Sequence, residues 1–156
     1  MRKLLDYVSL AGLVLLAWFS AGLLAGPHRL PARVPIHFGL DGRPNGWGSP
    51  FLLLILPVVA CVLYVLMTLV ARNPGSFNYP VRVTRANLAR LQALALQMIA
   101  WLKAEIIWLF VCIQIASVHA ARIGRGGGIS AWLMPTALGV VFGTIIGYVV
   151  AMRRSA

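Results

Sequence analysis

Four apolar runs constrain the fold of this chain more than any other feature of its sequence. They cover residues 7–26, 51–71, 98–121 and 129–152. Each run is long enough to cross a bilayer as a helix, which takes about 20 residues. In lipid a backbone must satisfy its own hydrogen bonds, so runs of this length predict membrane-spanning α-helices. We therefore expect an all-α membrane protein in which four transmembrane helices form one domain over residues 1–156.

The charge of the chain supports the same class. Only 11% of its residues are charged, against roughly 25% in soluble proteins. A net charge of +11 would indicate nucleic-acid binding in a soluble domain. Here, however, the basic residues gather at the ends of the apolar runs, as they do in membrane proteins. We therefore expect the lipid bilayer as a partner and no nucleic acid.

The basic residues also predict how the chain is oriented. The side that carries both termini and the connection 72–97 has eight of them: Arg2, Lys3, Arg72, Arg82, Arg85, Arg90, Arg153 and Arg154. The other side has five: Arg29, Arg33, Arg43, Arg122 and Arg125. Because cytoplasmic loops carry the excess of Lys and Arg, both termini of this multi-pass cell-membrane protein are predicted to be cytoplasmic. The first run exceeds the 7–15 apolar residues typical of a signal peptide and is predicted to remain as a helix.

The loop at residues 27–50 interrupts the apolar pattern with a polar, aromatic and turn-rich stretch. It contains "RVPIHFGLDGRPNGWGSP", in which the DG and NG dipeptides are strong turn signals and "VPIHF" is extended in character. We expect an ordered, hairpin-like extracytoplasmic loop that caps the outer mouth of the helix bundle. Trp47 and Phe38 are expected to sit at the membrane interface, where aromatic rings concentrate.

This loop holds the candidate binding residues. A ligand, peptide or protein partner is expected to contact His37, Asp41, Arg43, Asn45 and Trp47. No catalytic residue is assigned, because the chain shows no recognisable catalytic constellation, and no cofactor is expected from the binding hypothesis. The alternative is a metal site formed by His37, Asp41 and His119, a donor set that would suit a transition metal. A third interpretation makes His37 a hydrogen-bonding side chain that holds the loop on the bundle.

Two charged residues lie inside the third run. A charge at mid-bilayer costs about 3 kcal/mol on insertion scales, so Glu105 needs protonation, water or a partner from a connection. Lys103 points to nearly the opposite side of the helix and is expected to snorkel toward the cytoplasmic surface. Glu105 is either a proton or ion relay group or a structural one. A stripe that it shares with Trp101, Trp108, Cys112 and His119 is expected to face the bundle interior.

The remaining patterns concern packing and helix ends. Gly139, Gly143 and Gly147 lie four residues apart, a spacing that lets helix backbones approach closely in lipid. This row predicts either packing against a sister helix of the same bundle or a homodimer through the fourth helix. Three residues are candidate N-caps of the second, third and fourth helices: Ser49, Thr84 and Ser130.

The first loop carries a recognisable family pattern: a Pro-x-His core, a Gly-x-Pro-Asn-Gly-aromatic turn and a Ser before the next helix. The matching positions are Pro35, His37, Gly42, Pro44, Asn45, Gly46, Trp47 and Ser49. In these residues the chain resembles domain of unknown function 1648, which also occurs in bacterial immunity proteins that protect producers of the sporulation-delaying toxin. The resemblance implies a small bacterial multi-helix membrane protein and supplies no established catalytic residues.

Two functions follow from these observations. The first is a non-enzymatic binding, sensing or immunity-like module that uses its first extracytoplasmic loop. The alternative is a small transporter or metal-dependent membrane enzyme that uses Glu105 and the cluster of His37, Asp41 and His119.

Overall fold

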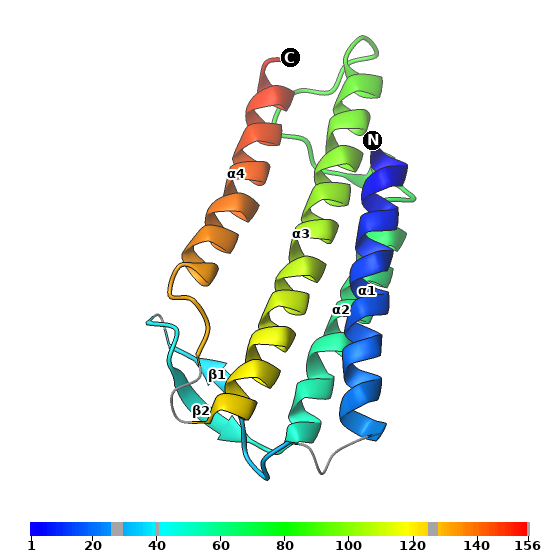
Figure 1. The fold of residues 1–156 in the computed structure, drawn as a ribbon. Coiled ribbons are helices and arrows are strands. Elements are labelled where there is room, and N and C mark those ends of the chain that lie inside the picture. Colours follow the sequence, from blue (N-terminus) through cyan, green and yellow to red (C-terminus); the bar gives the residue numbers. More distant parts are fainter. Residues whose placement is uncertain (26–29, 40, 125–127, 156) are drawn as a thin grey trace.

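The structure is a computed structural model that describes residues 1–25, 30–39, 41–124 and 128–155. Four long helices stand side by side, and the start of α1 and the end of α4 lie at the same end of the bundle (Figure 1). These helices are α1 (Arg2–Ala25), α2 (Ile55–Val70), α3 (Leu88–Ile123) and α4 (Leu133–Arg153). With the short turn before α2 included, all four are long and apolar enough to cross a membrane. The predicted four membrane-length helices are confirmed.

The α2 helix starts with a tighter turn than expected. Ser49 caps this turn: its Oγ accepts a hydrogen bond from the N–H of Phe51 at 3.4 Å, and Pro50 occupies the first helical position. Residues Pro50–Leu54 form a 3₁₀ turn, and regular α-helix begins only at Ile55. Pro57 follows at once and has no N–H to bond the carbonyl of Leu53. The predicted cap is therefore confirmed, whereas the first turn is not α-helical.

The α3 helix is the longest element of the chain. Its 36 residues span about 54 Å at 1.5 Å per residue, well beyond the roughly 30 Å hydrocarbon core of a bilayer. Thr84 and Asn87 stabilise its start reciprocally: Asn87 N–H donates to Thr84 Oγ1 at 3.3 Å, and Thr84 N–H donates to Asn87 Oδ1 at 2.8 Å. This is the geometry of a capping box, and it confirms Thr84 as a capping residue, although regular helix begins at Leu88.

The core lies along α3, which contacts all three other helices. Its buried face includes Ala100, Ala104, Ile107 and Val111, and the last two pack with Leu16 of α1 and Ala60 of α2. Small side chains at this face let α1 and α2 approach closely. At Gly12 of α1, for example, an added Cβ would lie 2.7 Å from Ile107 Cγ2.

The expected interior stripe of α3 is only partly correct: Glu105 contacts Thr144 of α4 and Trp108 donates a hydrogen bond to Val8 O of α1, but this is not the most buried face of the helix. Trp101, Trp108, Cys112 and His119 are all exposed on the bundle surface, whereas Lys103 and Gln114 on the opposite side are 4% and 0% exposed. The alanines lie at the most buried face of the helix, while Trp108 lies at the edge of the contact with α1, where its Nε1–H donates to Val8 O at 3.1 Å. The two polar side chains are consequently enclosed together with the apolar core.

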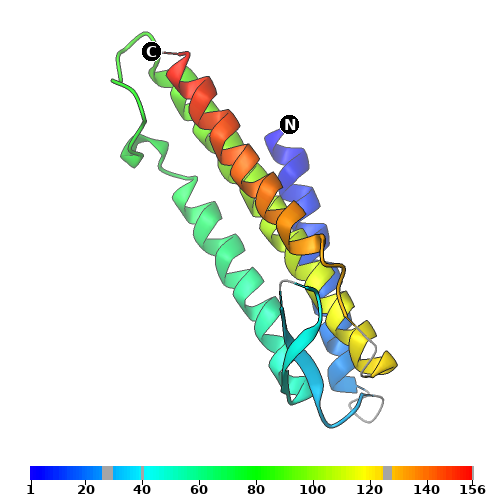
Figure 2. The same ribbon diagram turned by 90° about the vertical axis from the view of Figure 1, so that its left-hand side faces the viewer.

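Two short antiparallel strands, β1 (Val34–Phe38) and β2 (Pro44–Gly48), form a hairpin at the end of the bundle away from the termini (Figures 1 and 2). Val34 pairs with Gly48 and Pro35 with Trp47, and the register is irregular between Pro35 and Phe38. The predicted hairpin-like loop is confirmed. Over the residues that the structure describes, the fold is thus mostly helical with one small two-stranded sheet.

The hairpin is attached to the bundle at two separate points. Val34 is fully buried and packs with Leu53 of the 3₁₀ turn and with Val118 and Ala121 of α3. At the tip, Gly42 O accepts a hydrogen bond from Ile129 N–H at 2.9 Å. Gly42 has a φ of 75°, which favours glycine. A Cβ at this position would also collide with the carbonyl oxygen of Ile129.

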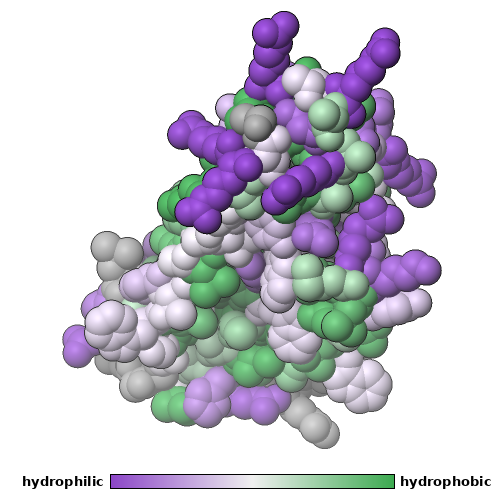
Figure 3. All heavy atoms as spheres, turned by 90° about the horizontal axis from the view of Figure 1, so that it is seen from above, coloured by the Kyte–Doolittle hydropathy of each residue, from purple (hydrophilic) through white to green (hydrophobic). Residues whose placement is uncertain are grey.

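The two ends of the bundle differ in charge. The eight basic residues at the terminal end, named above, are all exposed. Viewed from this end, long hydrophilic side chains project around the periphery of the molecule (Figure 3). Both termini and the connection between α2 and α3 share this end, as the sequence predicts for four spans.

Candidate functional site

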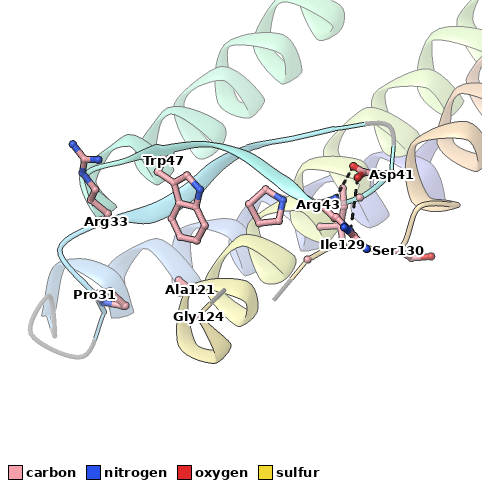
Figure 4. A pocket seen from close by; sticks show the side chains of 12 residues that line it. Pro31, Arg33, Asp41, Arg43, Trp47, Ala121, Gly124, Ile129 and Ser130 are labelled. Atoms are coloured by element: carbon pink, nitrogen blue, oxygen red, sulfur yellow. Dashed lines mark hydrogen bonds and ion pairs between the residues drawn. The ribbon is translucent and has the colours of Figure 1, made fainter. Parts of the chain in front are cut away.

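A cavity of about 1130 Å³ lies between the hairpin and the last turn of α3. We call it the hairpin hollow. Its lining comes from three segments that are distant in sequence: the hairpin, the end of α3 and the connection that leads to α4 (Figure 4). The lining residues used below are Arg33, Asp41, Arg43, Pro44, Trp47, Ala121, Gly124, Ile129 and Ser130.

Trp47 forms an apolar wall of the hairpin hollow. Its ring projects from β2 toward the end of α3, near Ala121 and Gly124 (Figure 4). The side chain is 40% exposed, so a large part of the indole surface remains accessible. An exposed indole that faces a cavity offers a flat apolar surface together with one N–H donor.

Asp41 and Arg43 supply the charges of the hollow. Arg43 N–H donates to Asp41 Oδ1 at 3.1 Å, and Arg43 Nε lies 3.9 Å from Asp41 Oδ2. Their side chains are 63% and 87% exposed, and an ion pair this exposed contributes at most about 1 kcal/mol. Both groups can therefore exchange their mutual contact for contact with a ligand. Arg33 also lines the hollow, but its guanidinium points away from it (Figure 4).

His37 and Asn45 lie outside the lining. His37 Nδ1 forms a hydrogen bond with Asn45 Oδ1, which links β1 to β2. Gly46 makes this close approach of the strands possible, because a Cβ there would lie 2.9 Å from His37 Cβ. The five predicted binding residues therefore separate into three that line the hollow and two that brace the hairpin. Among the described residues, His37 forms its hydrogen bond within the hairpin and not with the bundle.

The expected metal cluster is not assembled. In the described part of the chain, no group of three or more His, Cys, Asp or Glu side chains lies close enough to hold a metal ion. His37 bonds to Asn45, Asp41 lies beside Arg43, and His119 is exposed on α3. The hypothesis was based on the expectation that His37, Asp41 and His119 lie at the same end of the bundle. This shared location does not bring the three side chains together.

Lys103 does not snorkel as expected. Its Nζ lies 2.6 Å from Asp6 Oδ1 of α1 and 3.2 Å from Thr68 Oγ1 of α2, and it sits 4.5 Å from the ring centroid of Tyr64. Sequence reasoning missed Asp6 as a partner. The position along the helices could have predicted this pair. Asp6 is the acidic residue of the first helix, and it lies about as far from the terminal end of the bundle as Lys103.

Glu105 has a partner that the sequence did not indicate. Thr144 Oγ1 of α4 donates a hydrogen bond to Glu105 Oε1 at 2.6 Å. The other carboxyl oxygen, Oε2, is buried and has no hydrogen-bond partner among the described residues. Of the three alternatives for Glu105, the partner from a connection is wrong: the hydrogen-bonding group comes from the neighbouring helix, because α4 packs on the side of α3 that carries Glu105. Protonation and access to water stay predictions.

The glycine row of α4 faces away from the rest of the described chain. Gly139, Gly143 and Gly147 are exposed, and a Cβ added at any of them would meet no described atom within 4 Å. The expected packing of this row against a sister helix is wrong, because α4 contacts α3 through another face. A homodimer through α4 stays a prediction.

The first loop and its flanking helices also carry the family signal. Residues 12–61 match the family model of DUF1648, a domain of unknown function. The predicted resemblance is confirmed for this segment, which runs from α1 through the hairpin into α2. No curated protein and no solved structure matches the chain. The DUF1648 segment thus supplies Asp41, Arg43 and Trp47, while α3 and its connection to α4 complete the hollow.

Proposed function

We propose that the protein is a non-enzymatic membrane binding module whose hairpin hollow receives a ligand or a peptide segment of a partner protein. The observation that carries this proposal is the hollow itself, in which Trp47, Asp41 and Arg43 line one cavity. The two attachments of the hairpin support it further, because a pre-organised site loses less entropy on binding. A sensing or immunity-like role fits such a module.

The lining indicates the chemistry of the ligand. The Trp47 ring offers a flat surface for an apolar or aromatic group, and the guanidinium of Arg43 suits a carboxylate or phosphate. Ser130 and the carboxylate of Asp41 add polar partners. A peptide segment that carries an acidic group for Arg43, an apolar or aromatic side chain for Trp47 and N–H groups that donate to Asp41 uses all of these features.

Photocrosslinking in intact cells tests the proposal. A photoreactive amino acid at Trp47 is expected to give a discrete adduct, and Arg43→Gln is expected to abolish it at unchanged protein level. The control position is Trp132, which is 77% exposed and does not line the hollow. Equal adducts from both positions, or an adduct that survives Arg43→Gln, would contradict binding in the hollow.

The proposal places the hairpin on the extracytoplasmic side, with both termini in the cytoplasm. The excess of basic residues at the terminal end supports this orientation. In a variant without Cys61 and Cys112, an impermeant maleimide added to intact cells should label Ser130→Cys and leave Ser155→Cys unlabelled. The reverse pattern would put the hollow on the wrong side for an external ligand.

A small transporter is the second candidate function. One observation favours it: Glu105 Oε2 is buried between helices without a hydrogen-bond partner among the described residues, and such intramembrane carboxyl groups often carry protons or ions. In liposomes with an entrapped pH dye, Glu105→Gln should abolish proton flux and Thr144→Ala should only alter its rate. No flux above that of empty liposomes would remove this candidate.

A further inference from the structure

We propose that a second pocket, at the terminal end of the bundle, binds a phosphate group, and that the phosphate belongs to an anionic phospholipid. This inference is independent of the hairpin hollow, which lies at the other end of the molecule. The pocket has a volume of about 400 Å³ and lies between α1, α2 and α3. Arg2, Arg72, Asp6 and Lys103 supply its charged lining.

The charges of this pocket do not cancel. Asp6 and Lys103 neutralise each other through their contact of 2.6 Å, and the Lys103 ammonium is further occupied by Thr68 and the Tyr64 ring. Within the described residues, neither Arg2 nor Arg72 forms an ion pair. Two guanidinium groups with no compensating carboxylate therefore line one cavity. This arrangement favours a ligand with one or two negative charges.

The helix ends around the pocket agree with an anionic ligand. The N-terminus of α1, where Arg2 lies, carries the positive end of the helix dipole. The C-terminal end of α2 would oppose an anion, but three of its last four carbonyls accept hydrogen bonds from the residues that follow. The N–H groups of Ala71, Arg72 and Asn73 donate to the carbonyls of Met67, Leu69 and Val70 at 3.0, 3.0 and 3.2 Å.

The rest of the lining favours a lipid over a free phosphate ion. Leu96, Ile99 and Ala100 of α3 form an apolar wall beside the charged groups. The pocket also lies at the end of the bundle where the exposed basic side chains collect, the level expected for lipid headgroups (Figure 3). A phosphodiester can meet the two arginines while its glycerol and acyl carbons lie against the apolar wall.

Lipid binding to the full chain in a neutral detergent tests the proposal by native mass spectrometry. The probes are phosphatidylglycerol, phosphatidylcholine and inorganic phosphate. The wild type is expected to prefer phosphatidylglycerol over phosphatidylcholine by roughly 30-fold, taking about fivefold for each arginine. The double variant Arg2→Gln/Arg72→Gln should lose this preference. Arg82→Gln, which removes an exposed charge at the same end but outside the pocket, should retain it.

The possible outcomes separate the sources of the phosphate. If inorganic phosphate displaces phosphatidylglycerol at millimolar concentration, and the double variant binds neither, the site takes phosphate but is not specific for lipid. Equal binding of both lipids by the wild type would overturn the proposal. The same holds if Arg82→Gln loses as much preference as the double variant. Because Arg2 and Arg72 are exposed, we expect the double variant to fold. Its helical circular dichroism spectrum, compared with that of the wild type, is the control for folding.

Discussion

The Nζ of Lys103 lies 2.6 Å from Oδ1 of Asp6, and this ion pair joins α3 to α1 across 97 residues of chain. The lysine side chain is 4% exposed and the aspartate side chain 37%. Thr68 of α2 completes the contact at 3.2 Å. Three helices therefore meet at one ammonium group, near the terminal end of the bundle.

Removal of Asp6 should destabilise the protein more than removal of both partners. Asp6→Ala leaves a buried ammonium without its counter-ion, which costs about 3 kcal/mol for a pair of which one member is buried. The double variant Asp6→Ala/Lys103→Met removes the charge and should recover most of the loss. Denaturant unfolding in detergent measures both. Equal losses in the single and double variants would show that the pair does not hold the helices.

His37→Ala and Asn45→Ala should have the same effect. Each removes one side of the hydrogen bond between β1 and β2, for which we expect about 1 kcal/mol or less at this exposed position. The double variant should be no worse than either single variant. Amide hydrogen exchange over residues 34–48 measures the effect. Additive losses would mean that the two side chains act independently, and that His37 has another partner.

Gly42→Ala should release the hairpin tip from the α3–α4 connection. The substitution strains a residue whose φ is 75° and drives a Cβ into the carbonyl oxygen of Ile129. Gly124→Ala is the matched control, because Gly124 has a φ of 81° but its Cβ would meet no described atom within 4 Å. Relative to the wild type, the rate of proteolysis near residues 41–43 should increase severalfold more in Gly42→Ala than in Gly124→Ala. Equal rates would assign the effect to backbone strain alone.

Gly143→Leu should fold normally as a single chain, whereas Gly12→Leu should not. A side chain at Gly143 enters open space, but at Gly12 its Cβ would lie 2.7 Å from Ile107 Cγ2. Overpacking of this kind costs about 1–3 kcal/mol. Thermal unfolding of the two variants in detergent gives the comparison. Crosslinking at Gly143 in membranes would separately show whether a second copy lies on this face.

Tyr79→Phe should remove a pH dependence at the terminal end. Tyr79 OH donates to Pro74 O at 2.8 Å, and burial raises the pKa of the Tyr79 phenol above its usual 10.0. A raised pKa favours the protonated form in the folded state, so this contribution is present below about pH 10 and is lost as the pH rises further. The free energy of unfolding should therefore change less between pH 8 and pH 11 in Tyr79→Phe than in the wild type. At neutral pH the variant should lose about 1 kcal/mol.

Local patterns predicted the elements of this fold better than the contacts between them. The apolar runs, the Ser49 and Thr84 caps and the DG dipeptide at the hairpin tip each act over a few neighbouring residues, and each appears in the structure as expected. The turn predicted at the NG dipeptide is wrong, because Asn45 and Gly46 lie inside β2, where Gly46 pairs with His37. The rotation of α3 depends instead on which face lets other helices approach. Helical spacing groups Trp101, Glu105, Trp108, Cys112 and His119 on one stripe, but it does not indicate that the face with Ala100, Ala104, Ile107 and Val111 is the more closely packed one.

The same distinction explains the candidate site. Asp41, Arg43 and Trp47 were found because they share one loop, but the hollow also needs Ala121, Ile129 and Ser130 from the far half of the chain. The contacts of Lys103 with Asp6 and of Glu105 with Thr144 join helices whose relative rotation is not encoded in any short stretch. The distance of each residue from the end of its helix is the feature of the sequence that could have suggested these two contacts.

The long separation between Asp6 and Lys103 has a consequence for biosynthesis. At roughly 5–20 residues per second, a ribosome needs about 5–20 s to make the chain between them. During this interval the carboxylate of Asp6 has no Lys103 to pair with, and α1 cannot yet dock against α3. Assembly of the bundle is thereby delayed until the third hydrophobic segment has left the ribosome.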